Sequence, residues 1–245
     1  MSRIRSSETG AIFLVGDRGI RGLVIEMLSK EDEICVEDDC ITVGAGMLLS
    51  KTANRAAEHG LTGMEFAAGI PGSIGGAVVM NAGAYGGEMK DILTAVTVLD
   101  QEGNEKILSA EELELGYRTS CILKKGYIVT GAKIKLKHGE ETAIRARMEE
   151  LKKQRVEKQP LEYPSAGSTF KRPEGYFAGK LIMDAGLRGY LVGEAQVSEK
   201  HCGFVINRGN ATAADVRTLM QNVADIVEEK FGVRLEPEVK MIGEF

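Results

Sequence analysis

The stretch from Glu65 to Glu88 (EFAAGIPGSIGGAVVMNAGAYGGE) constrains the fold most, because seven of the nineteen residues from 69 to 87 are glycine. A glycine inside a helix or strand costs about 0.5–1 kcal/mol relative to alanine, so this composition predicts a long loop. Glycine also allows a ligand to approach the backbone, and successive N–H groups in such turns bind anions. The residues alone favour a structural turn and a phosphate cradle equally.

Two familiar nucleotide-binding motifs are excluded for this stretch. It lacks the Lys-Ser/Thr pair of a nucleoside-triphosphate loop, and it does not follow a strand as GxGxxG. Neither motif therefore explains the glycines.

The overall charge limits the class of partner. The chain has 31 Lys+Arg and 36 Asp+Glu, a net charge of −5. Nucleic acids and anionic membranes bind concentrated positive charge, so neither is expected as a partner. The sequence has no bilayer-length apolar run and no signal-peptide core near residue 1, so we predict a cytoplasmic protein, and we expect a monomer.

The cysteines and histidines predict no metal site. Cys35, Cys40, Cys121 and Cys202 form no CxxC pair, and the three histidines are isolated in the sequence. We therefore expect reduced thiols, at least one of them buried.

Apolar periodicity and turn residues predict the elements of the first half of the chain. Ser50 is expected to cap a helix that Gly60 ends, and Ser109 with Glu112 to form a capping box for a short helix. The predicted strands are two short runs within 11–28 around a Gly-Asp-Arg-Gly turn, 40–46, a hairpin of 95–100 with 106–109, and 127–137.

The second half is predicted to begin with a charged helix at 141–158, which carries a narrow apolar stripe. Next come a polar loop at 164–175, a short helix, and a buried strand at 203–209. Thr212 and Asp215 cap a long amphipathic helix that Gly232 stops, and the last residues form a strand. Strands and helices mix without a βαβ repeat, which indicates the α+β class.

Four segments together resemble one enzyme family. They are Glu65–Glu88, Tyr117-Arg118-Thr119-Ser120, Pro164–Pro173 (PSAGSTFKRP) and Leu235–Gly243 (LEPEVKMIG). In order and spacing they are similar to UDP-N-acetylenolpyruvoylglucosamine reductases, the flavoenzymes of early peptidoglycan synthesis. No inserted tyrosine-bearing loop separates the second and third segments, so the chain resembles the shorter type of the family.

The resemblance implies a vanillyl-alcohol-oxidase type of FAD-binding domain over 1–140 and a smaller α+β domain for the UDP-sugar over 141–245. It implies FAD as the cofactor, NADPH as the co-substrate, and UDP-N-acetylglucosamine enolpyruvate as the compound that is reduced to UDP-N-acetylmuramate.

The resemblance also implies three catalytic residues. Ser168 is expected to donate a proton, while Arg118 and Glu238 hold and polarise an enolate. Taken singly, each has a structural alternative: Ser168 as a turn residue, Arg118 as a salt-bridge partner, and Glu238 as an exposed strand position.

The remaining site residues follow from the same resemblance. The residues expected to contact FAD are Gly69, Pro71, Gly72, Ser73, Ile74, Gly75, Gly76, Ala77, Asn81, Gly83 and Ala84. Those expected to bind the sugar nucleotide are Lys158, Tyr163, Lys171, Arg172 and Gln196, with Ser198 and Lys200 as further candidates. His201 is expected to be packed or solvent-exposed rather than catalytic.

The sequence departs from the family near its start. Family members have a further N-terminal segment and a GxGSNLLV-like phosphate loop, whereas residues 8–15 here read ETGAIFLV. An alternative function is therefore a truncated relative that binds the sugar nucleotide, holds flavin poorly and is inactive.

Overall fold

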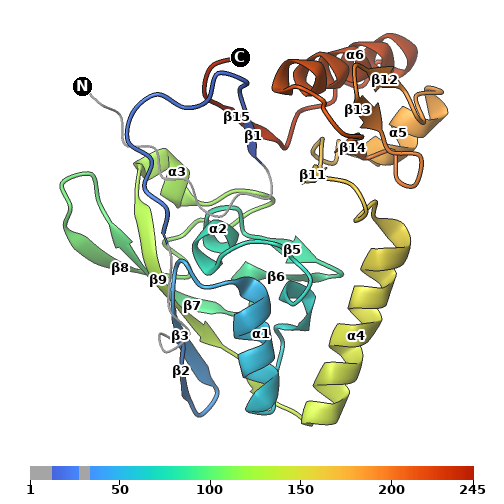
Figure 1. Cartoon of the computed structure of the whole chain (residues 1–245). Helices are drawn as coiled ribbons and strands as arrows, with labels where there is room; N and C mark the ends of the chain where they lie inside the picture. The colour runs from blue at the N-terminus through green and yellow to red at the C-terminus, as the bar shows by residue number, and fades with distance from the viewer. Residues whose placement is uncertain (1–12, 28–33) are drawn as a thin grey trace. The chain divides into compact units, whose positions relative to one another are not determined.

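The computed structural model describes residues 13–27 and 34–245, and its mixture of helices and sheets confirms the predicted α+β class (Figure 1). These residues divide into two compact units. We call 24–27 with 34–155 the central unit, and 13–23 with 156–245 the C-terminal unit. Residues 8–12 of the altered phosphate loop lie outside the described part of the chain.

The division between the units differs from the predicted boundary. The sequence places it at 140/141, where helix α4 (Glu141–Lys158) begins, whereas the units change over between Arg155 and Val156, inside that helix. The segment 13–23 also groups with the C-terminal residues. The roles assigned to the two predicted domains stay predictions.

An antiparallel sheet of five strands forms the core of the central unit. Its order is β2 (Ile34–Glu37), β3 (Cys40–Gly44), β9 (Ile128–Lys135), β7 (Leu93–Leu99) and β8 (Glu105–Ser109). The predicted β7–β8 hairpin is confirmed, with Leu99 opposite Glu105 at its closed end. Short pairs add β4 (Leu61–Thr62) to β10 (Lys137–His138), and β5 (Gly83–Ala84) to β6 (Gly87–Glu88).

The prediction of one long loop at 65–88 is wrong, because this stretch contains the 3₁₀ turn η2 (Glu65–Ala67) and helix α2 (Ile74–Val79). Ser73 caps α2, accepting the Gly76 N–H at 3.2 Å. The Gly75 N–H donates to the Ala45 carbonyl at 2.8 Å, which joins the start of the helix to the segment after β3. Tertiary contacts therefore outweigh the low helix propensity of glycine.

Helix α1 (Leu49–Glu58) begins without the predicted serine cap. Ser50 lies inside the helix, and the cap position is Leu48, which is bridged to Ser73. The Leu49 N–H donates to the Gly72 carbonyl at 3.0 Å. A backbone partner from the glycine-rich stretch thus replaces the side-chain cap.

The capping box at Ser109 forms without its helix. The N–H of Ser109 donates to the Glu112 carboxylate at 2.9 Å, but the following residues make turns. Glu114 has a φ of 50°, which no α-helix contains, and Leu113 is fully buried. The predicted short helix is therefore wrong, because the chain turns to bury Leu113. The next helix is α3 (Cys121–Lys125).

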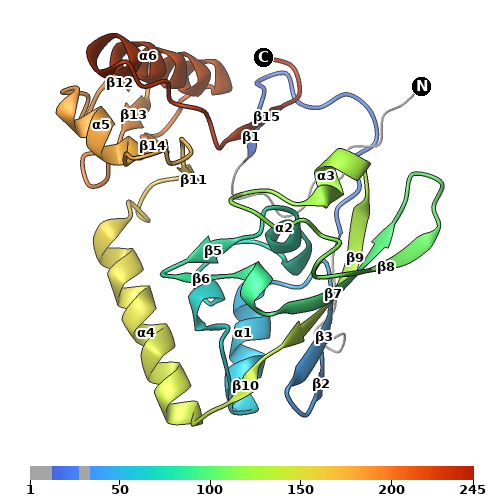
Figure 2. The same cartoon turned by 180° about the vertical axis from the view of Figure 1, so that it is seen from behind.

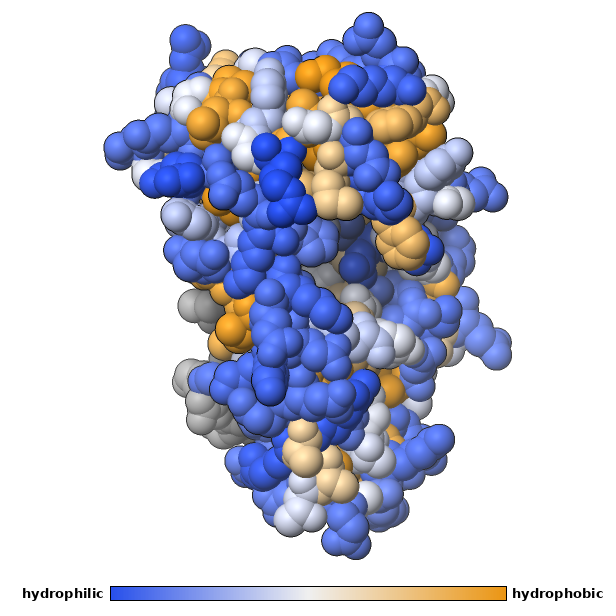
Figure 3. Space-filling model, turned by 90° about the vertical axis from the view of Figure 1, so that its right-hand side faces the viewer, coloured by the Kyte–Doolittle hydropathy of each residue, from blue (hydrophilic) through white to orange (hydrophobic). Residues whose placement is uncertain are grey.

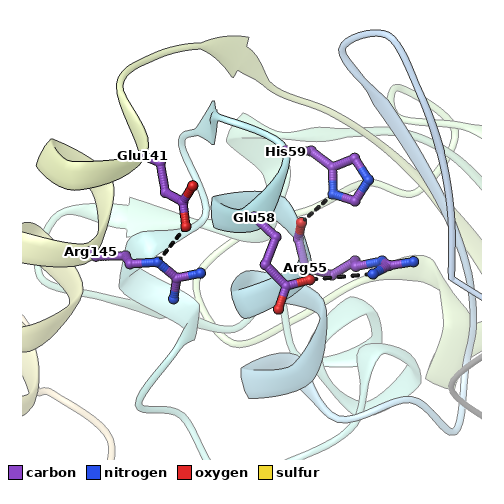
Figure 4. Close-up of polar contacts among 5 residues, drawn as sticks. All are labelled: Arg55, Glu58, His59, Glu141 and Arg145. Atoms are coloured by element: carbon purple, nitrogen blue, oxygen red, sulfur yellow. Dashed lines mark hydrogen bonds and ion pairs between the residues drawn. The ribbon is translucent and has the colours of Figure 1, made fainter.

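Helix α4 has the predicted bounds, and the predicted apolar stripe of Ile144, Met148 and Leu151 packs inward. Its outer face is hydrophilic (Figure 3). At its start, Glu141 accepts from Arg145 at 2.7 Å (Figure 4).

The nearby end of α1 carries similar surface contacts. Arg55 donates to Glu58 at 3.3 Å, and the His59 ring contacts the Arg55 carbonyl (Figure 4). Exposed ion pairs of this kind contribute less than about 1 kcal/mol each to folding stability. These contacts therefore do not indicate a functional site.

The C-terminal unit is built on a four-stranded antiparallel sheet (Figure 2). Its order is β11 (Ser165–Ser168), β14 (Phe204–Asn207), β13 (Ala195–Val197) and β12 (Leu191–Val192). Helices α5 (Ala178–Asp184) and α6 (Ala213–Phe231) pack together beside it. The buried strand, the capping box of α6 and its glycine stop are confirmed.

The segment 164–175, predicted as a loop, contains β11. The first apolar run is strand β1 (Phe13–Val15), which pairs in parallel with β15 (Lys240–Ile242). A turn follows, in which the Gly19 N–H donates to the Gly16 carbonyl. The second predicted strand is not formed at 23–27, where Leu23 is 79% exposed.

Among residues 13–27 and 34–245, no helix has the length and apolar character needed to cross a bilayer. In the same ranges, no group of three or more His, Cys, Asp and Glu side chains is placed to hold a metal ion. Two of the four cysteines, Cys121 and Cys202, are buried, as predicted for at least one.

Candidate functional site

The buried side chain of Asn81 holds together two of the family-like segments in the central unit. Its amide nitrogen donates to Glu88 at 2.7 Å and to the Gly116 carbonyl at 3.0 Å. Its oxygen accepts the Lys90 N–H at 2.9 Å. The amide is thus engaged inside the protein, and Asn81 fixes the glycine-rich stretch against the Tyr117–Ser120 segment.

Arg118 lies against the same stretch. Its Nη2 donates to the Gly83 carbonyl at 3.4 Å, and its guanidinium carbon is 5.6 Å from the centre of the Tyr117 ring. The structure therefore brings the predicted catalytic arginine next to Gly83, which was predicted to contact FAD.

Three non-glycine residues in this region have left-handed backbones. The φ angles are 43° for Asn81, 53° for Tyr85 and 53° for Arg118. Such conformations cost on the order of 1 kcal/mol each and are held by the surrounding structure. Their concentration around Gly83 marks this region as a functional-site candidate on geometric grounds.

Several N–H groups that were predicted to bind the FAD diphosphate already donate hydrogen bonds within the protein. The N–H groups of Ile74 and Gly75 donate to Met47 and Ala45, and those of Gly76 and Ala77 to Ser73. All four N–H groups are used within the protein, where they hold the start of helix α2. Gly69 is held by an arginine that the sequence analysis missed, because its carbonyl accepts a hydrogen bond from Arg155. Burial lowers the pKa of that guanidinium.

The turn at Gly86 leaves backbone accessible beside Arg118. Gly83 and Ala84 are half-buried, and a Cβ placed on Gly86 would meet no atom within 4 Å. At Gly83, by contrast, a Cβ would lie 2.7 Å from the Glu88 side chain, so the backbone is open at Gly86, and Arg118 supplies a cation beside Gly83. The residues present are therefore compatible with a bound flavin.

In the C-terminal unit, the structure brings the segments that carry Ser168 and Glu238 side by side. Ser168 is exposed at the end of β11, after the bulge at Gly167, whose φ is 79°. The next residue, Thr169, accepts the Glu238 N–H at 2.9 Å. Two segments far apart in the sequence therefore run side by side, and the Glu238 side chain is largely buried.

Lys171 and Arg172 continue this pairing. Lys171 forms an ion pair with Glu236 at 3.0 Å. The Arg172 guanidinium lies 4.0 Å from the centre of the exposed Phe177 ring, and its Nε donates to the Tyr176 carbonyl at 3.3 Å. Both predicted substrate-binding cations therefore already have protein contacts.

Gln196 and Tyr163 are connected through an arginine that the sequence analysis missed. Arg208 donates to Gln196 at 2.8 Å, and its guanidinium carbon is 5.4 Å from the centre of the Tyr163 ring. The only sequence signal was a basic residue after a buried strand, which is too common to identify a site.

Other candidates have structural roles. Ser198 is buried and accepts the N–H groups of Lys200 and His201. Lys200 donates to the Val156 carbonyl at 2.8 Å. His201 packs edge-on against Phe204, as expected for a packed residue, and partial burial lowers its imidazole pKa. Lys158 is exposed at the end of α4.

A cavity of about 390 Å³ also lies within the C-terminal unit. It is lined by β1, β11, β14 and the first turn of α6, together with Asp17. The predicted catalytic residues Ser168 and Glu238 are not among its lining residues, although their neighbours Thr169 and Val239 are.

Comparisons with known proteins cover both units. Residues 159–242 match the family described as UDP-N-acetylenolpyruvoylglucosamine reductase, C-terminal domain, and residues 4–109 match an FAD binding domain. The chain is 60% identical to the UDP-N-acetylenolpyruvoylglucosamine reductase of Agathobacter rectalis, over 96% of this chain and 79% of the relative. The enzyme of Clostridium tetani is 56% identical, over 96% and 76%.

A solved structure agrees with these relatives. It is the crystal structure of UDP-N-acetylenolpyruvylglucosamine reductase from Thermus caldophilus, which matches with a TM-score of 0.84 and 39% identity. The match covers 97% of this chain and 85% of that one.

Proposed function

The chain belongs to the UDP-N-acetylenolpyruvoylglucosamine reductase family, and we propose that it reduces UDP-N-acetylglucosamine enolpyruvate with the three residues Arg118, Ser168 and Glu238. The activity is an FAD-dependent oxidoreduction of peptidoglycan synthesis, with NADPH as the reductant. The match to the FAD binding domain does not favour the alternative of an inactive sugar-nucleotide binder.

The observation that carries the proposal is the backbone hydrogen bond between Thr169 and Glu238. It holds the residue after Ser168 beside Glu238, which stands 70 positions after Ser168 in the sequence. Proton transfer and charge stabilisation at one carbon need groups within hydrogen-bond reach of the same small molecule, and this pairing supports such an arrangement.

When bound, FAD supplies the hydride that is added to the double bond of the enolpyruvyl ether. We propose that Gly83 and Ala84 lie along its ring and that 69–73 approach its diphosphate. Hydride addition at the terminal carbon leaves negative charge on the neighbouring carbon and its carboxylate. Arg118 stabilises this charge, and the Ser168 hydroxyl donates a proton to that carbon, which completes the saturated lactyl ether.

The Glu238 carboxylate is assigned a positioning and polarising role toward the same substrate. Lys158, Tyr163, Lys171 and Arg172 are proposed to bind the sugar nucleotide. The monomeric state and the cytoplasmic location expected from the sequence stay predictions.

Ser168→Ala tests the assignment. The variant is expected to accept electrons from NADPH at the normal rate, seen as bleaching of the flavin absorbance. Its turnover of the enolpyruvyl substrate should fall by about 10²–10⁴-fold, the range for removal of a positioned proton-transfer group. Ser165→Ala, at the other end of β11, is the matched control. Normal turnover by Ser168→Ala would disprove the proton-donor role.

A further inference from the structure

Arg208 presents an oriented positive charge in the C-terminal unit. It follows β14, and its side chain is exposed. Its guanidinium carbon lies 5.4 Å from the centre of the Tyr163 ring, and Nη1 donates to Gln196 Oε1 at 2.8 Å. Its backbone N–H donates to the Glu194 carbonyl at 2.9 Å, which fixes the base of the side chain. Three separate contacts thus hold one exposed arginine.

Gln196 is a buried residue that holds the Arg208 side chain in place. It is only 4% exposed, so a ligand has almost no access to its amide. The oxygen accepts from Arg208, and Nε2 donates to the Gly189 carbonyl at 3.2 Å. An amide fixed at both ends orients its neighbour. Gln196 therefore influences a ligand through Arg208 and not by direct contact.

The groups that orient Arg208 are uncharged. Other arginines, such as Arg145 and Arg234, form ion pairs with a glutamate at 2.7 and 2.8 Å. In the described part of the chain, no carboxylate forms such a pair with Arg208. A guanidinium held by an amide and an aromatic ring keeps its full charge for an incoming anion, and its planar fork suits phosphate oxygens.

The position of Arg208 on the sheet fits the length of a sugar nucleotide. Ser168 is paired with Phe204, and Arg208 lies four residues farther along the same strand direction. At about 3.3 Å per residue, the backbone of Arg208 lies about 13 Å along the strand from Phe204, the residue paired with Ser168. The long arginine side chain can shorten the distance from its guanidinium to Ser168. In the substrate, the enolpyruvyl group and the diphosphate are attached to different carbons of one hexose ring.

We propose that Arg208 is a further substrate-binding residue that contacts the diphosphate of the sugar nucleotide, and that Gln196 is the positioning residue that orients it. The inference rests on the proposed function, because it takes Ser168 as the reacting end. Tyr163 then contributes its ring as a platform under the guanidinium.

Direct binding of UDP, UMP and uridine to the purified full-length protein tests this proposal without any redox chemistry. Arg208→Gln is expected to weaken UDP binding by about tenfold to hundredfold, as for loss of a charged hydrogen bond. Uridine lacks phosphate, so its affinity should change by less than twofold. In steady-state assays, KM for the enolpyruvyl substrate should rise similarly while kcat stays within about twofold.

Arg217→Gln is the matched control, because it removes the same charge from another exposed arginine that stacks on a ring, Phe245, at 5.0 Å. It should leave UDP binding unchanged. Equal weakening in both variants would show a non-specific charge effect and overturn the proposal. So would UDP binding by Arg208→Gln within twofold of the parent, or a parent protein that does not bind UDP.

The role of Gln196 has its own test. Gln196→Leu should weaken UDP binding several-fold. The double variant Gln196→Leu/Arg208→Gln should bind UDP no more weakly than Arg208→Gln alone. Additive losses would show that Gln196 does not act through Arg208. A parent protein that binds UDP through Arg208 but does not reduce the enolpyruvyl compound would disprove the proposed function and support the present inference.

Discussion

The carboxylate of Asp17 accepts a hydrogen bond from the backbone N–H of Ala213 at 2.7 Å, although the two residues are 196 positions apart. Its second oxygen accepts the Ala214 N–H at 3.0 Å. These donors belong to the first turn of α6, where N–H groups have no partner within the helix. Together with Thr212, which accepts the Asp215 N–H, Asp17 satisfies the start of this helix.

Replacing Asp17 should therefore destabilise the protein. Asp17→Ala removes two hydrogen bonds and a negative charge at a helix N-terminus, and we expect the free energy of unfolding to fall by about 1–2 kcal/mol. Asp17→Asn keeps one acceptor and should lose less. Urea denaturation followed by circular dichroism measures both, and an unchanged midpoint for Asp17→Ala would contradict this role.

Asn81 should matter for both stability and flavin retention. Asn81→Ala leaves Glu88, the Gly116 carbonyl and the Lys90 N–H without the amide, at an expected cost of about 2–3 kcal/mol. Because the amide fixes the stretch beside Arg118, the variant should also lose flavin absorbance on purification. Asn54→Ala removes one exposed hydrogen bond and should change stability by less than about 0.5 kcal/mol. Full flavin content and normal stability in Asn81→Ala would contradict the prediction.

Asp100 should contribute a pH-dependent part of the stability. Hydrogen bonds from Lys106, and then from the Asn104 backbone, hold the pKa of this carboxyl well below its ordinary 3.8. Because the folded state lowers the pKa, the stabilisation is fully present above the unfolded value and is lost as the pH falls below it.

The comparison of the parent with Asp100→Asn measures this contribution. The difference between their urea midpoints should be constant from about pH 7 to 5 and should shrink between about pH 4 and 2. A difference that persists unchanged to the lowest pH would show that the charge of Asp100 is not involved.

Elements specified by local sequence were predicted well. Helix α6 has a capping box at Thr212 and Asp215, an apolar stripe and a glycine stop, and all three are features of neighbouring residues. Helix α4 and the β7–β8 hairpin were predicted for the same reason. The class of fold followed from the mixture of these elements.

Elements that depend on distant partners were not predicted. The start of α1 is set by the Gly72 carbonyl and not by Ser50, and α2 forms among glycines because its backbone packs against the segment after β3. At Ser109 the local capping bonds form, yet burial of Leu113 turns the chain away from a helix. In each case a tertiary contact outweighs the local preference.

The candidate site shows the same division. The resemblance to the family selected Ser168 and Glu238, whose segments the structure pairs. It did not select Arg208, because the partners of that residue, Gln196 and Tyr163, meet it only in the folded chain. The sequence likewise could not predict that the N–H groups of 74–77 donate to Met47, Ala45 and Ser73, because two of these acceptors are brought near only by folding.

The pairing of β1 with β15 has a consequence for how the protein is made. Arg21 and Glu244, which form an ion pair beside these strands, are separated by 223 positions. At about 5–20 residues per second, a ribosome needs roughly 11–45 s to synthesise that interval. Throughout this time the apolar side chains of β1 lack their partner strand. The nascent chain is therefore exposed to chaperones and proteases until β15 has been synthesised.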